Sequence, residues 1–398
     1  MDNGCSVRNY VTRVITDPSL LNAEAWDGLL ARQPGGAASG PFMRHAYLAA
    51  LHTSGSAVPA TGWAPQWMTL WQGGELHAAA PLYVKNHSYG EYVFDWAWAN
   101  AYAQHGLDYY PKAVVAVPFT PVPGPRLLAL DSAAREALAQ AILAHCRALG
   151  LSSLHVLFAE PADRHACTNA GLMDRQTVQF HWTQRADRPW GDFDGFLASL
   201  TQEKRKKIRQ ERRRVAEAGV TFEHRRGRDI SAADWDFFYR CYARTYLEHG
   251  NPPYLHPAFF QAMAKQLPEH WLLFLARRAD GTPIACSLVA LSDESAHPEA
   301  AYGRYWGALE RVDCLHFEAC YYQPLQWCIA HGVRRFEGGA QGEHKMARAL
   351  LPVVTHSAHW LAHPAFADAV ERFLQREGDG VANYLEHLER RSPLRTPA

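Results

Sequence analysis

The sequence lacks several of the patterns that mark secreted or membrane proteins. Its eight cysteines form no Cys-x-x-Cys pair and most stand in apolar segments, which predicts reduced core thiols in a cytoplasmic protein. No apolar run is long enough to cross a bilayer, so we expect no integral membrane association. Residues 1–16 include Asp2 and no long apolar stretch, and we expect no signal peptide there.

Signatures of common enzyme classes are also missing. No Gly-x-Gly-x-x-Gly follows a predicted strand and no Walker loop is present, which disfavours a doubly wound nucleotide-binding sheet. The lack of a Gly-x-Ser-x-Gly elbow disfavours a serine hydrolase. His356, His359 and His363 lie close together without a carboxylate or cysteine beside them, so we expect no metal site. The formal net charge is zero, and any attraction for nucleic acid must therefore be local.

What the sequence does contain is typical of a globular chain of two ordinary domains. It has 398 residues, of which 48% are hydrophobic and 20% charged. Predicted hairpins alternate with predicted helices, which indicates α/β or α+β layers with mixed sheets.

Two stretches of the chain repeat the same order of features. Each has a strand, a turn containing glycine, a second strand, a Tyr-Gly-x-Tyr string and then a Tyr-Tyr pair. The first set runs through residues 67–110 and the second through 271–322. Features in one shared order indicate a duplicated domain. We therefore expect two tandem domains, residues 1–188 and 189–398.

A glycine-rich turn follows a predicted helix at 316–332 and a predicted strand at 333–336. It places three glycines in five positions beside acids, an amide, a histidine and a lysine. Glycine lets the backbone approach a ligand, and successive backbone N–H groups bind anions. A solvated turn is the alternative interpretation. The candidate groups of this turn are Glu337, Gly338, Gly339, Gln341, Gly342, His344 and Lys345.

A strongly basic helix is predicted over residues 193–218. Its cations would attract phosphate with an energy that falls as salt rises, and a solvated charged face is the other interpretation. Glutamates within the helix dilute its positive charge. The candidate anion-binding residues are Lys204, Arg205, Lys207 and Arg209.

Several unusual strings occur together in this chain. They are Pro-Phe at 41–42, His-Ser-Tyr-Gly-Glu-Tyr-Val-Phe-Asp-Trp at 87–96, Val-Pro-Phe-Thr-Pro-Val at 117–122, Lys-Arg-Lys at 204–206, Tyr-Gly-Arg-Tyr-Trp-Gly at 302–307, His-Phe-Glu at 316–318, Gly-Ala-Gln-Gly-Glu-His-Lys at 339–345 and Ser-Ala-His-Trp at 357–360. With them the sequence resembles the bacterial FemAB-like proteins of peptidoglycan biosynthesis or recognition, in the GNAT acyltransferase superfamily. The resemblance covers about residues 41–395.

The resemblance implies two GNAT-like domains and transfer of an aminoacyl group to an amine on a cell-wall precursor. It also implies that the Gly-Gly turn after Glu337, with the later Lys345, belongs to the site. GNAT enzymes that use acyl-CoA carry Arg/Gln-x-x-Gly-x-Gly/Ala at a helix N-terminus, where it cradles pyrophosphate. Residues 304–309 miss this pattern by one position, and residues 32–37 match it but precede no suitable helix. Acyl-CoA and aminoacyl-tRNA therefore both stay open as donors.

Acyl transfer to an amine needs a positioned amine, a base and donors for the developing oxyanion. Glu337, His344 and Lys345 are the candidate catalytic residues. Alternatives are that Glu337 pairs with an arginine such as Arg304 and that His344 is only exposed. Candidate substrate-binding residues beyond the turn are Arg304, Tyr305, Trp306, His316 and Glu318, which could instead be core, capping or helix-dipole partners.

The function predicted from the sequence is an N-acyltransferase that acts on an amine acceptor, with a small molecule, a precursor or tRNA as partner. Two alternatives stay open. One is a non-catalytic recognition protein that binds a cell-wall precursor or RNA. The other is a conventional acyl-CoA-dependent N-acetyltransferase.

Overall fold

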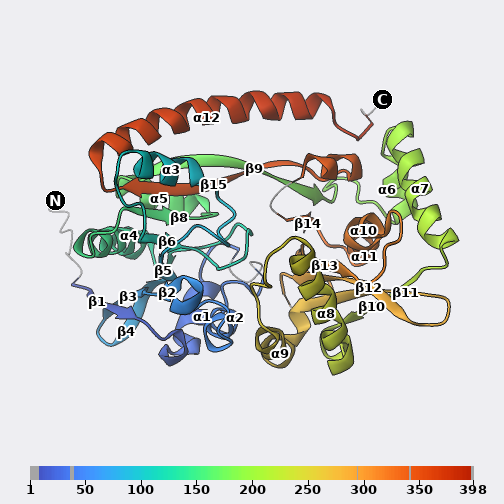
Figure 1. The fold of residues 1–398 in the computed structure, drawn as a ribbon, viewed down its shortest axis with the longest axis horizontal. Coiled ribbons are helices and arrows are strands. Elements are labelled where there is room, and N and C mark those ends of the chain that lie inside the picture. Colours follow the sequence, from blue (N-terminus) through green and yellow to red (C-terminus); the bar gives the residue numbers. More distant parts are fainter. Residues whose placement is uncertain (1–8, 36–39, 294, 340–341, 396–398) are drawn as a thin grey trace. The chain divides into compact units, whose positions relative to one another are not determined.

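The computed structural model describes residues 9–35, 40–293, 295–339 and 342–395, which form two compact units (Figure 1). Of the described residues, unit 1 contains 9–35, 43–175 and 356–375, and unit 2 contains 40–42, 176–293, 295–339, 342–355 and 376–395. The chain passes between them within β9 (Met173–Thr183), β15 (Leu351–Leu361) and α12 (Pro364–Arg390). The sequence predicted two contiguous domains, residues 1–188 and 189–398. Each of the two compact units is instead assembled from several separate segments of the chain, and the predicted domain limits remain a prediction.

Unit 1 contains two sheets (Figure 1). The first is antiparallel, in the order β1 (Val11–Ile15), β3 (Trp67–Gln72), β4 (Glu75–Ala80) and β7 (Leu128–Ala129). The second has the order β15, β8 (Ser153–Val156), β6 (Lys112–Val115), β5 (Leu82–Lys85) and β2 (Trp63–Pro65), with β6 and β8 parallel. The predicted hairpin at 67–85 is confirmed, but its second strand is divided at Pro81 between the two sheets.

The helices of unit 1 include α4 (Ser132–Ala148), whose apolar face supplies much of the unit's core. Leu138, Ile142 and Cys146 recur at helical spacing and are buried together with residues of both sheets. Asp131 caps the helix, accepting the Ala134 N–H at 2.9 Å. The other helices are α1 (Ala23–Ala31), α2 (His45–Thr53), α3 (Trp96–Gln104) and α5 (Pro161–Asn169).

Unit 2 is built on a mixed sheet. Its strand order is β10 (Thr221–Arg226), β11 (Trp271–Arg277), β12 (Pro283–Leu291), β13 (Ala300–Ala308), β14 (Arg335–Glu337) and β9. Only the β13–β14 pair among these is parallel. The predicted hairpin at 271–291 is confirmed as β11 and β12.

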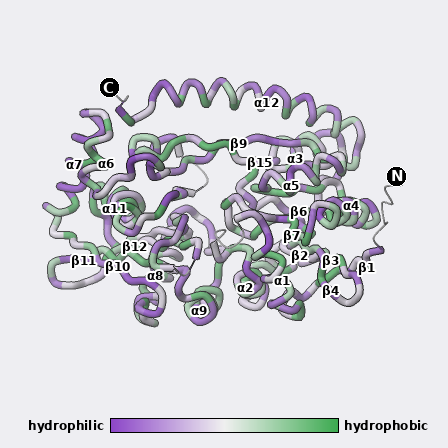
Figure 2. Tube along the Cα trace, turned by 180° about the vertical axis from the view of Figure 1, so that it is seen from behind, coloured by the Kyte–Doolittle hydropathy of each residue, from purple (hydrophilic) through white to green (hydrophobic). Residues whose placement is uncertain are grey.

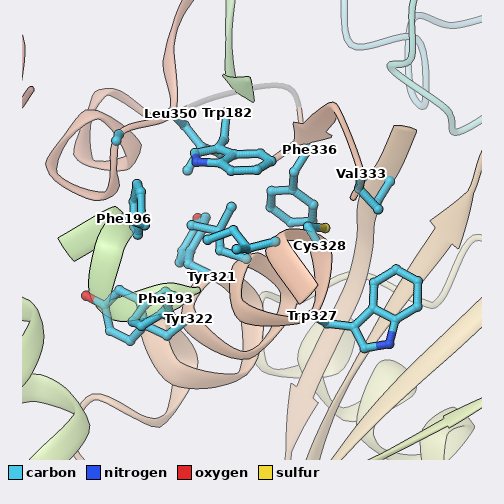
Figure 3. Close-up of a cluster of buried hydrophobic side chains, with 14 of the residues drawn as sticks. Trp182, Phe193, Phe196, Tyr321, Tyr322, Trp327, Cys328, Val333, Phe336 and Leu350 are labelled. Atoms are coloured by element: carbon cyan, nitrogen blue, oxygen red, sulfur yellow. The ribbon is translucent and has the colours of Figure 1, made fainter. Parts of the chain in front are cut away.

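Helices cover both faces of the unit 2 sheet. One face carries α8 (Ala232–Glu248) and α9 (Pro257–Gln266), whose aromatic rings pack on Trp271 and Tyr305. The other face carries α6 (Phe193–Ala198), α7 (Gln202–Glu217) and α11 (Gln323–Ala330), and their apolar residues form the cluster in Figure 3. There Phe193 and Phe196 of α6 gather with Trp182 of β9 and Phe336 of β14. Side chains that alternate along each strand thus serve two separate cores.

The basic helix predicted over residues 193–218 is wrong as a single element, because the chain breaks between α6 and α7. Leu200 there is buried and forms a β-bridge with Leu394. The Thr201 N–H donates to the Pro393 carbonyl at 2.9 Å. Pairing with the C-terminal segment thus satisfies backbone groups that a continuous helix would have used internally.

The helix predicted at 316–332 is present but irregular. It starts as α10 (Leu315–Phe317), widens to a π-helical turn at Glu318–Tyr322 and continues as α11. Cys314, just before it, has a φ of 66°, the left-handed conformation that non-glycine residues seldom adopt. Such π-turns inside helices are frequent at functional sites.

Candidate functional site

The candidate site begins where two parallel strands part. The β13–β14 ladder has three residue pairs and ends at Tyr302 opposite Glu337. β14 stops there, whereas β13 runs on to Ala308. A bulge at Arg304 interrupts the pairing of β13 with β12, because Leu288 faces Tyr305 while Val289 faces Gly303. The sheet therefore opens beside residues 303–306.

A cavity of about 150 Å³ occupies this opening. Gly338, directly after β14, forms one wall and Tyr321 of the π-turn another. Of the residues predicted from the sequence, those that line it are Arg304, Tyr305, Trp306, His316 and Gly338. Ser287, Leu288, Val289, Gly303, Cys320 and Tyr321 complete its lining.

Glu337 is the last residue of β14 and only 4% of it is exposed. Its Oε1 forms an ion pair with Arg335, whose Nε lies 2.9 Å away. Glu337 therefore does pair with an arginine, as the alternative interpretation supposed, but with Arg335 rather than Arg304. Within the described residues its Oε2 has no hydrogen-bond partner, and His181 Nε2 lies 3.8 Å away. Burial raises the pKa of Glu337 to about 7, while Arg335 and Arg304 oppose the rise. Burial lowers the pKa of His181 to about 3, which keeps that ring neutral.

Lys345 is also buried, and its side chain folds back onto the glycine-rich turn that precedes it. Its ammonium donates to the Gly339 carbonyl at 3.0 Å. Burial lowers the pKa of Lys345 to about 8. A Cβ on Gly338 would lie 2.5 Å from a terminal carbon of the Leu350 side chain, so any larger residue there would require Leu350 to move. The Gly338 N–H donates to the Phe180 carbonyl at 3.4 Å, so this predicted anion donor is already engaged. Gln341, another candidate, lies outside the described residues.

Two histidines flank the cavity. His316 packs its ring 5.3 Å from Trp306, and burial, assisted by nearby cations, lowers the pKa of His316 to about 4. His344 is exposed and follows Gly342, whose φ is 120°. His344 Nε2 lies 3.3 Å from the Tyr321 hydroxyl, and partial burial lowers its pKa. The His316 ring is therefore neutral at pH 7.

A buried ion pair fixes the segment that carries His344 and Lys345. Arg348 donates to both carboxylate oxygens of Glu211 on α7, at 3.1 and 3.2 Å. The same guanidinium donates to the His344 carbonyl at 3.0 Å. The Tyr322 hydroxyl donates to Glu211 as well, which ties the π-turn into the same network. Each buried charge thus has several partners, as such groups require.

Glu318 lies in the π-turn but does not line the cavity. Its carboxylate accepts from Arg212 of α7 at 3.1 and 3.2 Å and from Gln323 at 2.7 Å. Consecutive residues of α7, Glu211 and Arg212, therefore connect the basic helix to two sides of the site.

The predicted anion-binding residues lie on α7, away from the cavity lining (Figure 2, where α7 is mainly purple). Lys204 pairs with Glu203 at 2.9 Å, and Arg209 lies 3.7 Å from Asp194. Arg205 donates weakly to the Ala198 carbonyl at 3.5 Å. Lys207 is exposed, as are Lys206, Arg213 and Arg214. This face therefore presents a dense cationic surface to solvent.

Neither near-match to the pyrophosphate-binding pattern has the required geometry. Residues 304–308 belong to β13, so no helix N-terminus stands behind them. Arg32 follows the C-terminal end of α1, where the helix dipole disfavours anions, and Gly36 and Ala37 lie outside the described residues.

Sequence reasoning missed His181, Arg335 and Arg348. Glu337 lies opposite His181 in the antiparallel pair of β14 and β9. A prediction of how these two strands pair would therefore have identified His181 as a neighbour of Glu337. Arg335 stands two positions before Glu337 on the same face of β14, and Arg348 follows Lys345 by three residues. Among the described residues, no three metal-ligating side chains gather, and no helix there is both long and apolar enough to cross a membrane.

Comparison with known proteins identifies the family of this chain. The model of the FemAB-like family, described as peptidoglycan biosynthesis/recognition, matches residues 18–396. FemX superposes with a TM-score of 0.50 at 11% identity, over 88% of this chain and 98% of FemX. L-PGS from Bacillus licheniformis superposes with a TM-score of 0.52 at 11% identity, over 89% of this chain and 97% of L-PGS. No curated protein matches the chain. At such low identity these structures show the fold alone, and the expected mixed α/β fold with a Fem-type architecture is confirmed.

Proposed function

We propose that this chain, which belongs to the FemAB-like family of peptidoglycan biosynthesis/recognition proteins, is an N-acyltransferase that moves an acyl or aminoacyl group onto an amine. The observation that carries the proposal is a buried carboxyl group, Glu337, at the end of β14. It does not itself line the cavity, but Gly338, the next residue, forms one of the cavity walls. A proton acceptor with a pKa near 7 beside a small enclosed space suits the activation of an amine.

In this mechanism the amine attacks the carbonyl carbon of an activated ester or thioester. A C–N bond forms, and the bond from carbon to the carrier's oxygen or sulfur breaks. Glu337 takes the proton that the amine loses, and this proton then passes to the departing oxygen or sulfur of the carrier, which leaves Glu337 ionised again. The ammonium of Lys345 supplies positive charge near the developing oxyanion, aided by backbone N–H groups of the turn other than that of Gly338. Arg335 orients Glu337 by holding its Oε1.

The cationic face of α7 would hold an anionic donor or acceptor, such as a tRNA or a nucleotide-linked precursor. Helix α7 contacts the candidate site through Glu211, which pairs with Arg348, and through Arg212, which pairs with Glu318. These contacts support the binding of the anionic substrate close to the candidate site. The absence of a phosphate-binding helix N-terminus behind residues 304–308 supports aminoacyl-tRNA over acyl-CoA as donor. We place the reaction in the cytoplasm and in cell-wall precursor metabolism.

The test compares donors and then removes the cations. We expect purified protein to bind charged tRNA with an affinity that falls steeply with salt, and to lose most of it when Lys204, Arg205, Lys207 and Arg209 are all changed to Ala. A matched control changes Arg228 and Arg390, which are exposed but lie outside α7, to Ala. Salt-insensitive binding of acetyl-CoA that survives the fourfold change would instead make this an acyl-CoA enzyme.

A non-catalytic recognition protein is the rival proposal. It is favoured by the engagement of Glu337 with Arg335 and of Lys345 with Gly339, which leaves few catalytic groups unoccupied. Glu337→Gln separates the two proposals, because it keeps the shape of the side chain but cannot accept a proton. Loss of transfer with retained donor binding supports the enzyme. A cellular role that survives Glu337→Gln together with Lys345→Met would support recognition.

A further inference from the structure

A second pocket lies against the candidate site and is walled by tyrosines. It measures about 320 Å³, a size that suits a small ligand, and it lies between α8, the segment after it and β13. It shares Arg304, Tyr305 and Trp306 with the cavity described above. Its remaining walls are Tyr242, Thr245, Tyr246, His249, Asn251 and Tyr254.

The pocket exists because α8 crosses β13 at very short range. A Cβ on Gly307 would lie 2.1 Å from the Cys241 carbonyl oxygen, so only glycine permits this approach. One turn further along α8, the Thr245 hydroxyl donates to the Trp306 carbonyl at 2.9 Å. These contacts place Tyr242 and Tyr246 over the outer end of β13.

The tyrosine walls are held in place before any ligand arrives. The Tyr242 hydroxyl accepts the Leu255 N–H at 3.1 Å, and the Asn251 N–H donates to the Tyr246 carbonyl at 3.0 Å. The ring of Tyr246 lies 4.8 Å from that of Tyr242 and 5.3 Å from that of Tyr254. A preformed wall loses little conformational entropy on binding.

The polar groups of the pocket indicate the charge of its ligand. Among the described residues that line it, Arg304 supplies the positive charge and none is a carboxylate. The Arg304 guanidinium lies 5.1 Å from the centre of the Tyr305 ring, so a cation already stands over that ring. A cationic ligand would meet this charge at close range, whereas an anionic group would be attracted to it.

We infer that this pocket binds a planar aromatic ring that carries an anionic group, with the ring among the tyrosines and the anion toward Arg304. The inference rests on the proposed function, because it assigns the pocket to one of the two substrates of transfer. A nucleotide base with its phosphate and an aromatic carboxylic acid share this chemistry. The ring–ring contacts would supply the affinity and Arg304 the selection for negative charge.

The test is isothermal titration calorimetry on the full chain with four probes. They are adenosine monophosphate, adenosine, phenylacetate and inorganic phosphate. We expect either adenosine monophosphate or phenylacetate to bind with one site per chain. Adenosine should bind about tenfold more weakly than its monophosphate, because it lacks the charge that Arg304 would meet. Inorganic phosphate, which has no ring, should not bind measurably.

Substitutions at two residues, Tyr254 and Arg304, locate the binding. Tyr254→Ala should weaken the better probe about tenfold, whereas Tyr254→Phe, which keeps the ring, should not. Arg304→Gln should abolish the preference for the charged probe. Tyr89→Ala, an exposed tyrosine of unit 1, is the matched control and should bind like the unchanged protein. The melting temperature of each variant shows whether weaker binding comes from a change in the pocket or from partial unfolding of the protein.

Several results would overturn the inference. They are binding of neither ringed anion, adenosine binding as tightly as its monophosphate, or full affinity in a folded Tyr254→Ala protein. Calorimetry needs no turnover, so its outcome is independent of the transferase test. If the protein binds the probe in this pocket but transfers no acyl group, the proposed transferase function is contradicted while the inferred binding specificity of the pocket is supported.

Discussion

Lys112 in unit 1 and Lys345 in unit 2 are both buried lysines, and their surroundings differ. Lys112 is fully buried and donates to Ser88 at 2.7 Å, to Glu91 at 2.8 Å and to Asp95. Lys345 is 4% exposed, and within the described part of the chain its ammonium donates to one backbone carbonyl, that of Gly339. Burial acts against the charge of both, but the two carboxylates more than offset it at Lys112. The pKa of Lys112 is consequently raised, and that of Lys345 is lowered to about 8.

The comparison separates a structural charge from a reactive one. Lys112 belongs to a compensated network that also includes Tyr109, whose hydroxyl donates to Asp95 at 2.7 Å. Such a network stabilises the loop that carries Glu91 and Asp95, and the raised pKa of Lys112 keeps that lysine charged at physiological pH. Among the described residues Lys345 has no carboxylate partner, and its side chain lies against Gly338, which forms one wall of the cavity. Perturbed groups of this kind cluster at functional sites.

Removal of the structural lysine should have the largest effect. Lys112→Met leaves Glu91 and Asp95 buried without their main cation, which should lower the free energy of unfolding by about 3–5 kcal/mol. Urea denaturation followed by tryptophan fluorescence measures the change. Lys345→Met is the matched control, and it should cost much less because it removes one carbonyl contact and a penalised charge. Equal losses in the two variants would contradict the distinction.

Glu337→Gln should have the next largest effect, on the rate of transfer rather than on folding. Loss of the proton acceptor should lower the rate about 100-fold. In the unchanged protein the rate should rise with pH through about 7, as Glu337 ionises. A pH–rate profile with the preferred donor measures both effects. A profile that keeps its rise near pH 7 in the variant would assign the base elsewhere.

Stability should change in the opposite direction in this variant. The folded pKa of Glu337 is raised above its unfolded value, so its contribution to stability is present at low pH and lost as pH rises through about 7. Glu337→Gln removes that loss. Its unfolding free energy relative to the unchanged protein should therefore increase between pH 5 and pH 8.

Much of the fold could be predicted from periodicity and turn chemistry. Both hairpins appear where the repeated strand–turn–strand order predicts them, because their strands bury apolar side chains. The break between α6 and α7 could not be predicted, since its partner, Leu394, is almost 200 residues away in the sequence. The repeated Tyr-Gly-x-Tyr string also diverges in structure. Residues 302–305 lie in β13, whereas residues 89–92 form turns in which Gly90 and Tyr92 have positive φ.

The site was predictable in its residue types more than in its arrangement. The sequence placed Glu337 and Lys345 in one turn, but their environments depend on long-range neighbours. His181 and Arg335 surround the carboxylate, and Glu211 reaches the segment after Lys345 through Arg348. Burial decides the pKa of each group, and burial is set by strand register and helix packing that no local pattern encodes.

A smaller effect is expected at the crossing of α8 and β13 in unit 2. Gly307→Ala would drive a methyl group into the Cys241 carbonyl, so helix and strand must move apart. Overpacking of this kind should lower the free energy of unfolding by about 1–3 kcal/mol. It should also widen the tyrosine pocket and weaken its ligand. Thermal unfolding and calorimetry on one preparation test both effects, and an unchanged melting temperature would contradict the close approach.

The smallest effect is expected at a glycine of unit 1, and it should have the opposite sign. Gly28 lies within α1, is exposed and would meet no atom within 4 Å of an added Cβ. Gly28→Ala should therefore raise the free energy of unfolding by about 0.5–1 kcal/mol, because alanine loses less backbone entropy in a helix. A Gly28→Ala/Gly307→Ala double variant should show additive changes, since the methyl group added at Gly28 meets no atom within 4 Å and the one added at Gly307 meets Cys241. A Gly28→Ala variant that is less stable than the unchanged protein would contradict the open space seen around this position.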